Sequence, residues 1–325
     1  MSRSKTSFTF ICLSVIFIII FSQIVFGQQS EMKQKIKSSI LNRIKYASSP
    51  TKNFSTPTGR VLKSMEVMVS LGSSFGIEEN SGILGRLAVG LGGVAEVELT
   101  RSSFMNELTG QQGNLPTSIF KMGLVPERFS QYWFVPNISL QLHSTPWQSS
   151  VDEYSRLSES VKASYDASNL SRMNMDNRFT TLYGIIGKDF GLLSINGGVT
   201  LTDVRVRNGW QWIFDQELGS EVYHKIPEMQ KNLIAPFGNI SIAANDDTQL
   251  MGEVQAIPLI DYNIVSKQVQ IKRTWRAIVG VRFFIASWLS LDTGVKYLSS
   301  AKGIADSEVN VGLNLMVPFK TPSNN

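Results

Sequence analysis

The sequence has almost no cysteine or histidine, and this scarcity excludes several classes of protein. Cys12 is the only cysteine among the 325 residues, so no disulfide framework holds the chain together. The two histidines, His143 and His224, have no histidine or cysteine companion at metal-ligand spacing, so we expect neither a metal site nor a cofactor. His143 and Ser144 are adjacent, and adjacent strand residues face opposite ways, which argues against a histidine–serine hydrolase. We therefore predict that the protein is not an enzyme.

Long apolar runs are confined to the amino terminus. Arg3 and Lys5 precede an apolar core over residues 8–26, and Val25 and Gly27 stand at −3 and −1 of a cut before Gln28. This pattern predicts a signal peptide over residues 1–27 and Sec-type export. An uncleaved anchor is the alternative, because about twenty apolar residues can span a bilayer. No later run reaches eighteen apolar residues, so no further transmembrane helix is predicted.

Alternation of apolar with small or polar residues replaces long apolar runs in the rest of the chain. Between Val61 and Phe319 it recurs in twelve stretches, most clearly near the carboxyl end, where Val309, Val311, Leu313, Leu315 and Val317 alternate with Glu308, Asn310, Gly312 and Asn314. A period of two places the two sets on opposite faces of a strand. The facing is less clear in residues 117–125, 179–188, 191–201, 232–243 and 248–258. The pattern predicts an all-β, antiparallel up-and-down transmembrane β-barrel of about twelve strands over residues 61–325.

The connectors between the predicted strands also alternate in length. The longer ones are residues 74–81, 102–116, 144–177, 202–231, 259–270 and 298–306, and the shorter ones are 92–94, 126–131, 188–191, 244–247 and 284–288. Short periplasmic turns and long extracellular loops are typical of outer-membrane barrels. At residues 92–94 a three-residue hairpin loop predicts that Leu91 pairs with Ala95, and that Glu96 and Glu98 lie opposite Gly90 and Ala88.

The positive net charge of +5 comes from the two amino-terminal segments that precede the predicted barrel. Residues 1–27 contribute +2 and residues 28–60 contribute +6, which leaves −3 for residues 61–325. We therefore expect no nucleic-acid-binding face. Met32, Ile36, Ile40 and Ile44 recur at helical spacing, and residues 48–59 are rich in Ser, Thr and Pro. Residues 28–60 are predicted to be a basic periplasmic leader with a short helix and a linker. The helix rests on lipid headgroups, enters the barrel mouth or is simply solvated.

The last predicted strand resembles a known assembly signal. Asn310, Gly312, Leu315, Val317 and Phe319 are similar to the carboxyl-terminal signal of Gram-negative bacterial outer-membrane barrels of the porin-like superfamily, although Pro318 and a tail after Phe319 depart from it. The resemblance implies a location in the cell outer membrane. It also implies contact with outer-membrane lipid and lipopolysaccharide, and insertion by the barrel assembly machinery.

Charged residues are predicted on the inner face of the barrel: Glu66, Arg86, Glu96, Glu98, Arg276, Arg282, Asp292, Lys296 and Glu308. They form either a structural ion-pair network or the selectivity lining of a channel. Trp210 and Trp212, in the predicted loop 202–231, are candidate binding residues of the outer surface. The sequence thus favours a channel or transport barrel for small polar solutes. The alternative is a non-conducting barrel that acts in binding or structure through its long extracellular loops.

Overall fold

The computed structural model describes residues 51–72, 84–100, 117–125, 129, 132, 134–153, 172–215, 220–263, 268–299 and 307–318. The predicted signal peptide, the predicted leader helix and Phe319 lie outside these residues. No helix in the described part of the chain is both long enough and apolar enough to cross a membrane.

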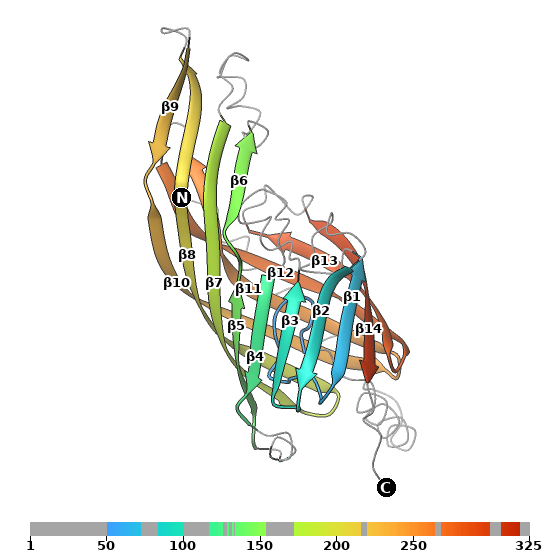
Figure 1. Cartoon of the computed structure of the whole chain (residues 1–325). Coiled ribbons are helices and arrows are strands. Elements are labelled where there is room, and N and C mark those ends of the chain that lie inside the picture. The colour runs from blue at the N-terminus through green and yellow to red at the C-terminus, as the bar shows by residue number, and fades with distance from the viewer. Residues whose placement is uncertain are drawn as a thin grey trace, which may run out of the picture.

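The described chain is built from antiparallel strands (Figure 1). They are β1 (Glu66–Gly72), β2 (Leu84–Leu91), β3 (Ala95–Thr100), β4 (Thr117–Gly123), β5 (Asn137–Ser144), β6 (Gln148–Glu153), β7 (Arg172–Asp189), β8 (Leu193–Asp215), β9 (Ser220–Ile226), β10 (Met229–Asn245), β11 (Thr248–Asn263), β12 (Gln268–Ala286), β13 (Leu289–Leu298) and β14 (Glu308–Pro318).

The fourteen strands occupy twelve positions in a closed wall. Strands β5 and β6 both pair with β7, and β9 and β10 both pair with β8, so each of these two pairs fills one position. Strand β1 pairs with β14 from Glu66↔Pro318 to Gly72↔Gly312, which closes the barrel. Closure leaves no sheet edge in the apolar part of the wall, as a membrane-spanning sheet requires. The predicted fold class and strand number are confirmed.

The β2–β3 hairpin has the predicted register. Leu91 pairs with Ala95, and Gly90 and Ala88 lie opposite Glu96 and Glu98. The loop requires glycine, because Gly92 and Gly93 have φ of 66° and 69°. The alternate residues Val97 and Leu99 are exposed on the outside of the barrel. This wall is therefore apolar towards lipid and polar towards the lumen.

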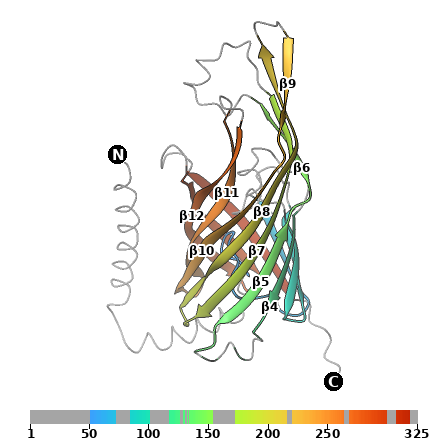
Figure 2. The same cartoon turned by 90° about the vertical axis from the view of Figure 1, so that its left-hand side faces the viewer.

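The wall extends beyond its apolar band at the end that carries the long connectors. Leu182, Leu201 and Ile234 form an outward row and are 42%, 47% and 63% exposed. The next outward row is polar and consists of Thr180, Asp203 and Asn232. The apolar band therefore ends between these two rows. Above it, β6, β9 and the ends of β7 and β8 project as an extension, which Figure 2 shows from the side.

Within the extension the two faces exchange character. Phe179, Val204, Leu233, Ile257 and Ile271 form one buried apolar cluster. A second cluster contains Met175, Val206 and Ile226. Phe179, Val204 and Ile257 each lie two residues beyond a buried polar residue of the lumen on the same strand, as Val204 follows Thr202. The extension therefore buries apolar side chains inside and exposes polar ones, as a sheet in water does.

The prediction of long loops over residues 144–177 and 202–231 is wrong for most of their described residues. These residues form β6, the start of β7, the end of β8, β9 and the start of β10. Alternation continues there with its polarity reversed, because Val204 and Val206 now face inward while Arg205 faces outward. Trp210 accordingly lies on β8 opposite Lys225 and is 42% exposed, and Trp212 lies opposite Tyr223.

Candidate functional site

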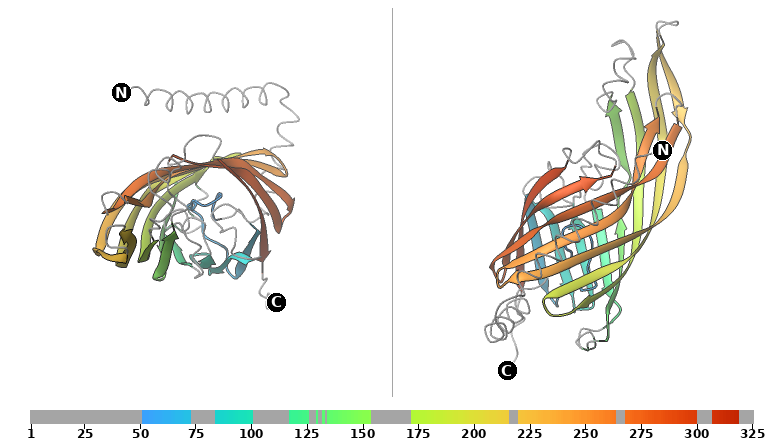
Figure 3. Two further views of the ribbon diagram at one scale, coloured as in Figure 1. Left: turned by 90° about the horizontal axis from the view of Figure 1, so that it is seen from above. Right: turned by 180° about the vertical axis from the view of Figure 1, so that it is seen from behind.

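Residues 51–64 lie inside the barrel, and we call them the plug. Seen from above, this blue segment runs within the ring of strands (Figure 3). The residues expected to end a periplasmic linker are thus largely buried, and Thr51 and Thr56 are fully so. The Ser, Thr, Pro and Gly content that predicted a linker here produces a compact loop. In it the Thr58 amide donates to the Thr51 carbonyl at 2.8 Å.

Glu253 on β11 holds the tip of the plug. Its carboxylate accepts the backbone N–H groups of Phe54, Ser55 and Thr56, at 3.2, 3.0 and 3.0 Å to Oε2. The Thr56 hydroxyl donates to Oε2 at 2.8 Å, and the Ser55 hydroxyl donates to Oε1. Arg276 donates from Nη2 to the Ser55 hydroxyl at 2.7 Å. A single buried carboxylate thus accepts hydrogen bonds from three consecutive amides. These bonds are strong because the acceptor is charged.

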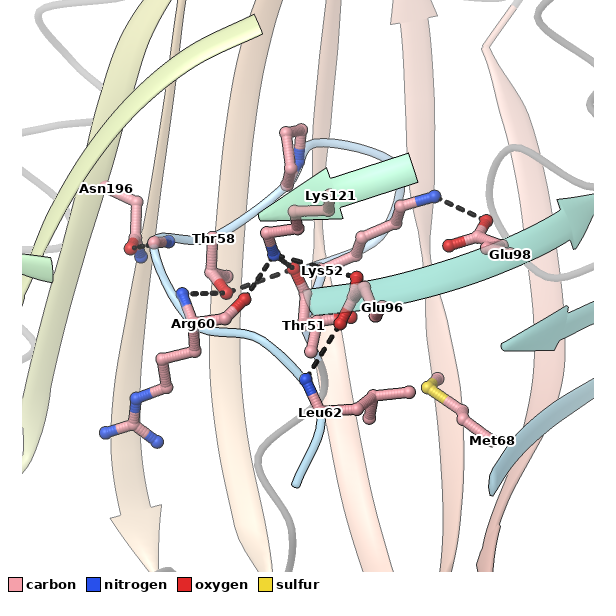
Figure 4. A network of polar contacts seen from close by, with 12 residues as sticks. Thr51, Lys52, Thr58, Arg60, Leu62, Met68, Glu96, Glu98, Lys121 and Asn196 are labelled. Atoms are coloured by element: carbon pink, nitrogen blue, oxygen red, sulfur yellow. Dashed lines mark hydrogen bonds and ion pairs between the residues drawn. The ribbon is translucent and has the colours of Figure 1, made fainter. Parts of the chain in front are cut away.

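Two cationic side chains of the wall bind carbonyl groups of the plug. Lys121 on β4 donates from Nζ to the Thr51 carbonyl at 3.1 Å and also to the Arg60 carbonyl (Figure 4). Arg282 on β12 donates to the Asn53 carbonyl at 2.9 Å. Arg282 is itself held by Asp292 on β13 through two bonds of 2.6 and 2.7 Å. The plug therefore satisfies donors on opposite parts of the wall.

Two asparagines and one glutamate of the wall make further contacts with the main chain of the plug. Asn239 on β10 donates to the Pro57 carbonyl at 3.1 Å. Asn196 on β8 accepts the Gly59 amide at 2.9 Å, and the Nδ2 group of Asn196 donates to Asn239. On β3, Glu96 accepts the Leu62 amide at 2.8 Å. Each contact leaves one fewer unpaired polar group inside the lumen.

The plug is cationic and the wall supplies matching carboxylates. Residues 51–64 contain Lys52, Arg60 and Lys63 and no acidic residue. Lys52 Nζ lies 2.6 Å from Glu98, and Arg60 lies 2.7 Å from Asp189. The Lys52–Glu98 pair is buried, so it is little screened by solvent.

Two apolar side chains anchor the ends of the plug. Phe54 packs against Met251 and Ile278. Leu62 packs in a separate buried cluster with Met68, Ala88 and Met316.

A glycine of the wall makes room for the Leu62 end of the plug. A Cβ atom at Gly90 would lie 2.0 Å from the Lys63 carbonyl oxygen and 2.8 Å from the Leu62 Cβ. The alternation that places glycine on the inner face of β2 therefore lets the plug approach the wall closely.

The structure places the predicted lumen-lining residues as follows. Buried side chains belong to Glu66, Arg86, Glu96, Glu98, Arg276, Arg282, Asp292 and Lys296. Of these, Glu66, Arg86, Glu96, Glu98, Arg276 and Arg282 contact residues 51–63. The side chain of Glu308 lies outside the described structure, as do those of Asn310 and Trp212. In the predicted assembly signal, Gly312 is buried, Leu315 is partly buried and Val317 is exposed, all on β14.

Sequence reasoning missed the residues that bind the plug most directly. They are Lys121, Asn196, Asn239 and Glu253. All four lie on strands whose facing was unclear from sequence. Glu253 follows Gly252, and a glycine in place of an outward apolar residue weakens the alternation there. A polar residue flanked by apolar ones, as Lys121 is by Phe120 and Met122, is a signal that would have identified Lys121. The other three each have a glycine on one side, so only one apolar neighbour marks them.

No group of three or more His, Cys, Asp or Glu side chains that could hold a metal ion occurs among the described residues. No protein-family model and no curated protein sequence matches the chain.

Solved structures with a similar fold include the translocator domain of autotransporter NalP from Neisseria meningitidis, with 10% identity over 86% of this chain and 94% of that chain, at a TM-score of 0.45. The copper transporter OprC is similar with 13% identity over 73% of this chain and 46% of that chain, at a TM-score of 0.30. The NanC porin is similar with 11% identity over 79% of this chain and all of that chain, at a TM-score of 0.27. These are all β-barrels of outer-membrane type. The strand pairing and the two faces of the wall make this chain a closed twelve-stranded β-barrel of outer-membrane type, with its own residues 51–64 in the lumen.

Proposed function

We propose that the protein is an outer-membrane channel for small polar solutes whose lumen is closed at rest by residues 51–64. The observation that carries this proposal is the seat of the plug, which charged and polar wall residues hold mainly through hydrogen bonds. Without the plug, the same side chains would line a wettable passage and would act on solutes through their charge.

The chemistry of the seat supports a plug that can leave. Its bonds are polar, so water that enters the lumen can hydrate each donor and acceptor that the plug leaves, at a cost of about 1.5–3 kcal/mol for each bond to a charged group. Two apolar anchors, Phe54 and Leu62, oppose release. The plug continues directly into β1, so it can leave its seat while it remains tethered to the barrel.

The size of the barrel is consistent with such a passage. A barrel of about eight strands is filled by its own side chains, and one of sixteen to eighteen strands holds a wide water channel. Twelve positions leave room for the folded-back loop of the plug beside the side chains. Removal of that segment would give a narrow pore.

Deletion of residues 51–60 tests the proposal. We expect the folded variant to give steady single-channel currents in planar bilayers, and the unaltered chain to open only briefly. Deletion of the ten residues 38–47, which lie in the leader and outside the plug, is the matched control. A deletion variant that is β-rich and heat-modifiable yet never conducts would refute the channel.

Export and location form part of the same proposal. Residues 1–27 would direct export through the Sec pathway of a Gram-negative bacterium, and the barrel machinery would insert the mature chain beside lipopolysaccharide. We propose no enzymatic activity. Mass spectrometry of the amino terminus of the membrane-inserted protein tests this assignment, because cleavage before Gln28 is expected and an intact Met1 end would contradict it.

A second function is favoured by the extension above the apolar band. Trp210 is exposed on β8, and the Arg207 guanidinium stacks on the Trp147 ring at 3.8 Å. Exposed aromatic side chains are common at binding surfaces. If the barrel acts as a surface binding module, deletion of residues 209–226 would abolish partner binding while the barrel still folds.

A further inference from the structure

We propose that the lumen wall is a binding surface for polypeptide folded back into a tight loop, and that the solute is a short peptide that can adopt such a loop. This inference rests on the proposed channel and names its substrate class. It starts from the plug, which is a peptide bound in the lumen.

The wall binds both the main chain and the side chains of the plug, and the main-chain contacts are the ones that any peptide could make. Nine main-chain atoms of residues 51–62 have wall partners: the amides of Phe54, Ser55, Thr56, Gly59 and Leu62 and the carbonyls of Thr51, Asn53, Pro57 and Arg60. Every polypeptide presents these groups, whatever its side chains. This main-chain part of the recognition tolerates changes of sequence. The ion pairs of Lys52 and Arg60 add a preference for cationic side chains.

The wall presents hydrogen-bond acceptors to the amides of the plug and hydrogen-bond donors to its carbonyls. Carboxylate oxygens of Glu253 and Glu96 accept amide hydrogens, and Lys121 and Arg282 donate to carbonyl oxygens. Side chains such as Asn239 contribute to the same pattern. Sugar hydroxyls can also donate and accept hydrogen bonds, but neither a sugar nor an inorganic ion carries an apolar side chain for the two seats that Phe54 and Leu62 occupy. The chemistry therefore favours a peptide.

Two apolar seats add a limited preference. One is formed by Met251 and Ile278 around Phe54, and the other lies around Leu62. The anchors are eight residues apart in the chain. A peptide of about a dozen residues with an apolar side chain near each end would fill both seats.

The experiment uses the full chain with its own plug weakened and its wall intact. Phe54→Glu places a carboxylate beside Glu253 and removes one anchor, so it should release the plug. A fluorescent peptide with the sequence of residues 51–64, TKNFSTPTGRVLKS, is then titrated into the solubilised barrel, and anisotropy reports binding without any need for conduction. If Phe54→Glu fails to fold, Leu62→Glu removes the other anchor.

Three altered peptides separate backbone recognition from side-chain recognition. N-methylation of the amides of Phe54, Ser55 and Thr56 should weaken binding at least about tenfold, because three donors to Glu253 are lost. N-methylation at Val61, whose amide has no hydrogen bond to the described wall, is the control and should have little effect. A peptide with alanine everywhere except at the positions of Phe54, Pro57, Gly59 and Leu62 should bind more weakly than the original but still measurably. It keeps the nine main-chain groups and both apolar anchors, and it loses the ion pairs of Lys52 and Arg60.

The results distinguish this inference from the channel itself. If the alanine peptide fails to bind, or N-methylation at residues 54–56 has no effect, the wall recognises only its own plug and the inference is overturned. If peptides bind to a barrel that never conducts, the channel fails and peptide recognition stands. If the barrel conducts and peptides of every kind leave both anisotropy and current unchanged, the channel stands and the inference fails.

Discussion

Replacement of Glu253 by glutamine should release the plug without disturbing the wall. The substitution keeps the size and shape of the side chain and removes its charge. In the structure the carboxylate accepts three backbone amides and two hydroxyls of the plug. A glutamine keeps one acceptor oxygen and turns an NH₂ group towards the remaining donors.

The size of the effect follows from these contacts. A hydrogen bond to a charged group contributes about 1.5–3 kcal/mol and a neutral one about 0.5–1.5 kcal/mol. The loss is therefore about 1 kcal/mol for each of the three amide bonds, or about 3 kcal/mol for the seat. Because about 1.4 kcal/mol corresponds to a factor of ten, the ratio of released to seated plug should rise roughly 150-fold.

Trypsin and single-channel recording measure this ratio independently. Lys52 is buried in the seated plug, so cleavage after Lys52, followed by mass spectrometry, reports release. We expect faster cleavage and a higher open probability in Glu253→Gln. Asp203→Asn makes the same chemical change on the extension, where Asp203 accepts bonds from Arg205 and Gln230, and should alter neither readout. Equal cleavage rates and equal open probabilities in both variants would refute the reasoning.

Three further predictions concern the wall. Arg282→Met leaves Asp292 buried without its partner and should lower the free energy of unfolding by about 3–5 kcal/mol in urea titrations, and Asp292→Asn added to it should recover part of the loss. Gly90→Ala should displace the plug and speed trypsin cleavage after Lys52, because the added Cβ would lie 2.0 Å from a carbonyl oxygen of the plug. Gly252→Ala is the control and should not change the cleavage rate, because its Cβ makes only an ordinary contact at 3.5 Å. Ile234→Lys should destabilise the barrel in lipid by about 2–4 kcal/mol if its outward row lies near the bilayer midplane, and by less nearer the interface; no loss at all would contradict the assignment of the apolar band.

The fold could be predicted because period-two alternation determines which face each residue occupies. The hairpin at Gly92 and Gly93 illustrates this, since alternation and a three-residue loop were enough to predict that Glu96 and Glu98 lie opposite small residues. The closed topology followed from the same alternation combined with connector lengths. The extension was missed because alternation there keeps its period and reverses its polarity, so β8 beyond Thr202 did not fit the expected pattern of apolar residues facing lipid.

The plug could not be predicted because its contacts join residues that are far apart in the sequence. Glu253 lies about 200 residues from the amides it accepts, and nothing in the local sequence of either segment indicates the other. A stretch rich in Ser, Thr, Pro and Gly has the composition of a solvated linker, and only a matching wall makes it a ligand. The charged residues of the inner face could be identified from the alternation within each strand. The plug that they bind in common could not.

The most direct test of the account is a reversible lock on the plug. In a chain with Cys12→Ser, the pair Gly59→Cys and Asn137→Cys should form a disulfide between the plug and the wall. A Cβ at Gly59 would lie 2.8 Å from the Cβ of Asn137, and a shift of about 1 Å brings the two to the separation found in disulfides. Single-channel recording should show no openings while the disulfide is intact, and openings in the same preparation after reduction. Equal currents before and after reduction, with the cross-link confirmed by mass spectrometry, would show that residues 51–64 do not close the lumen.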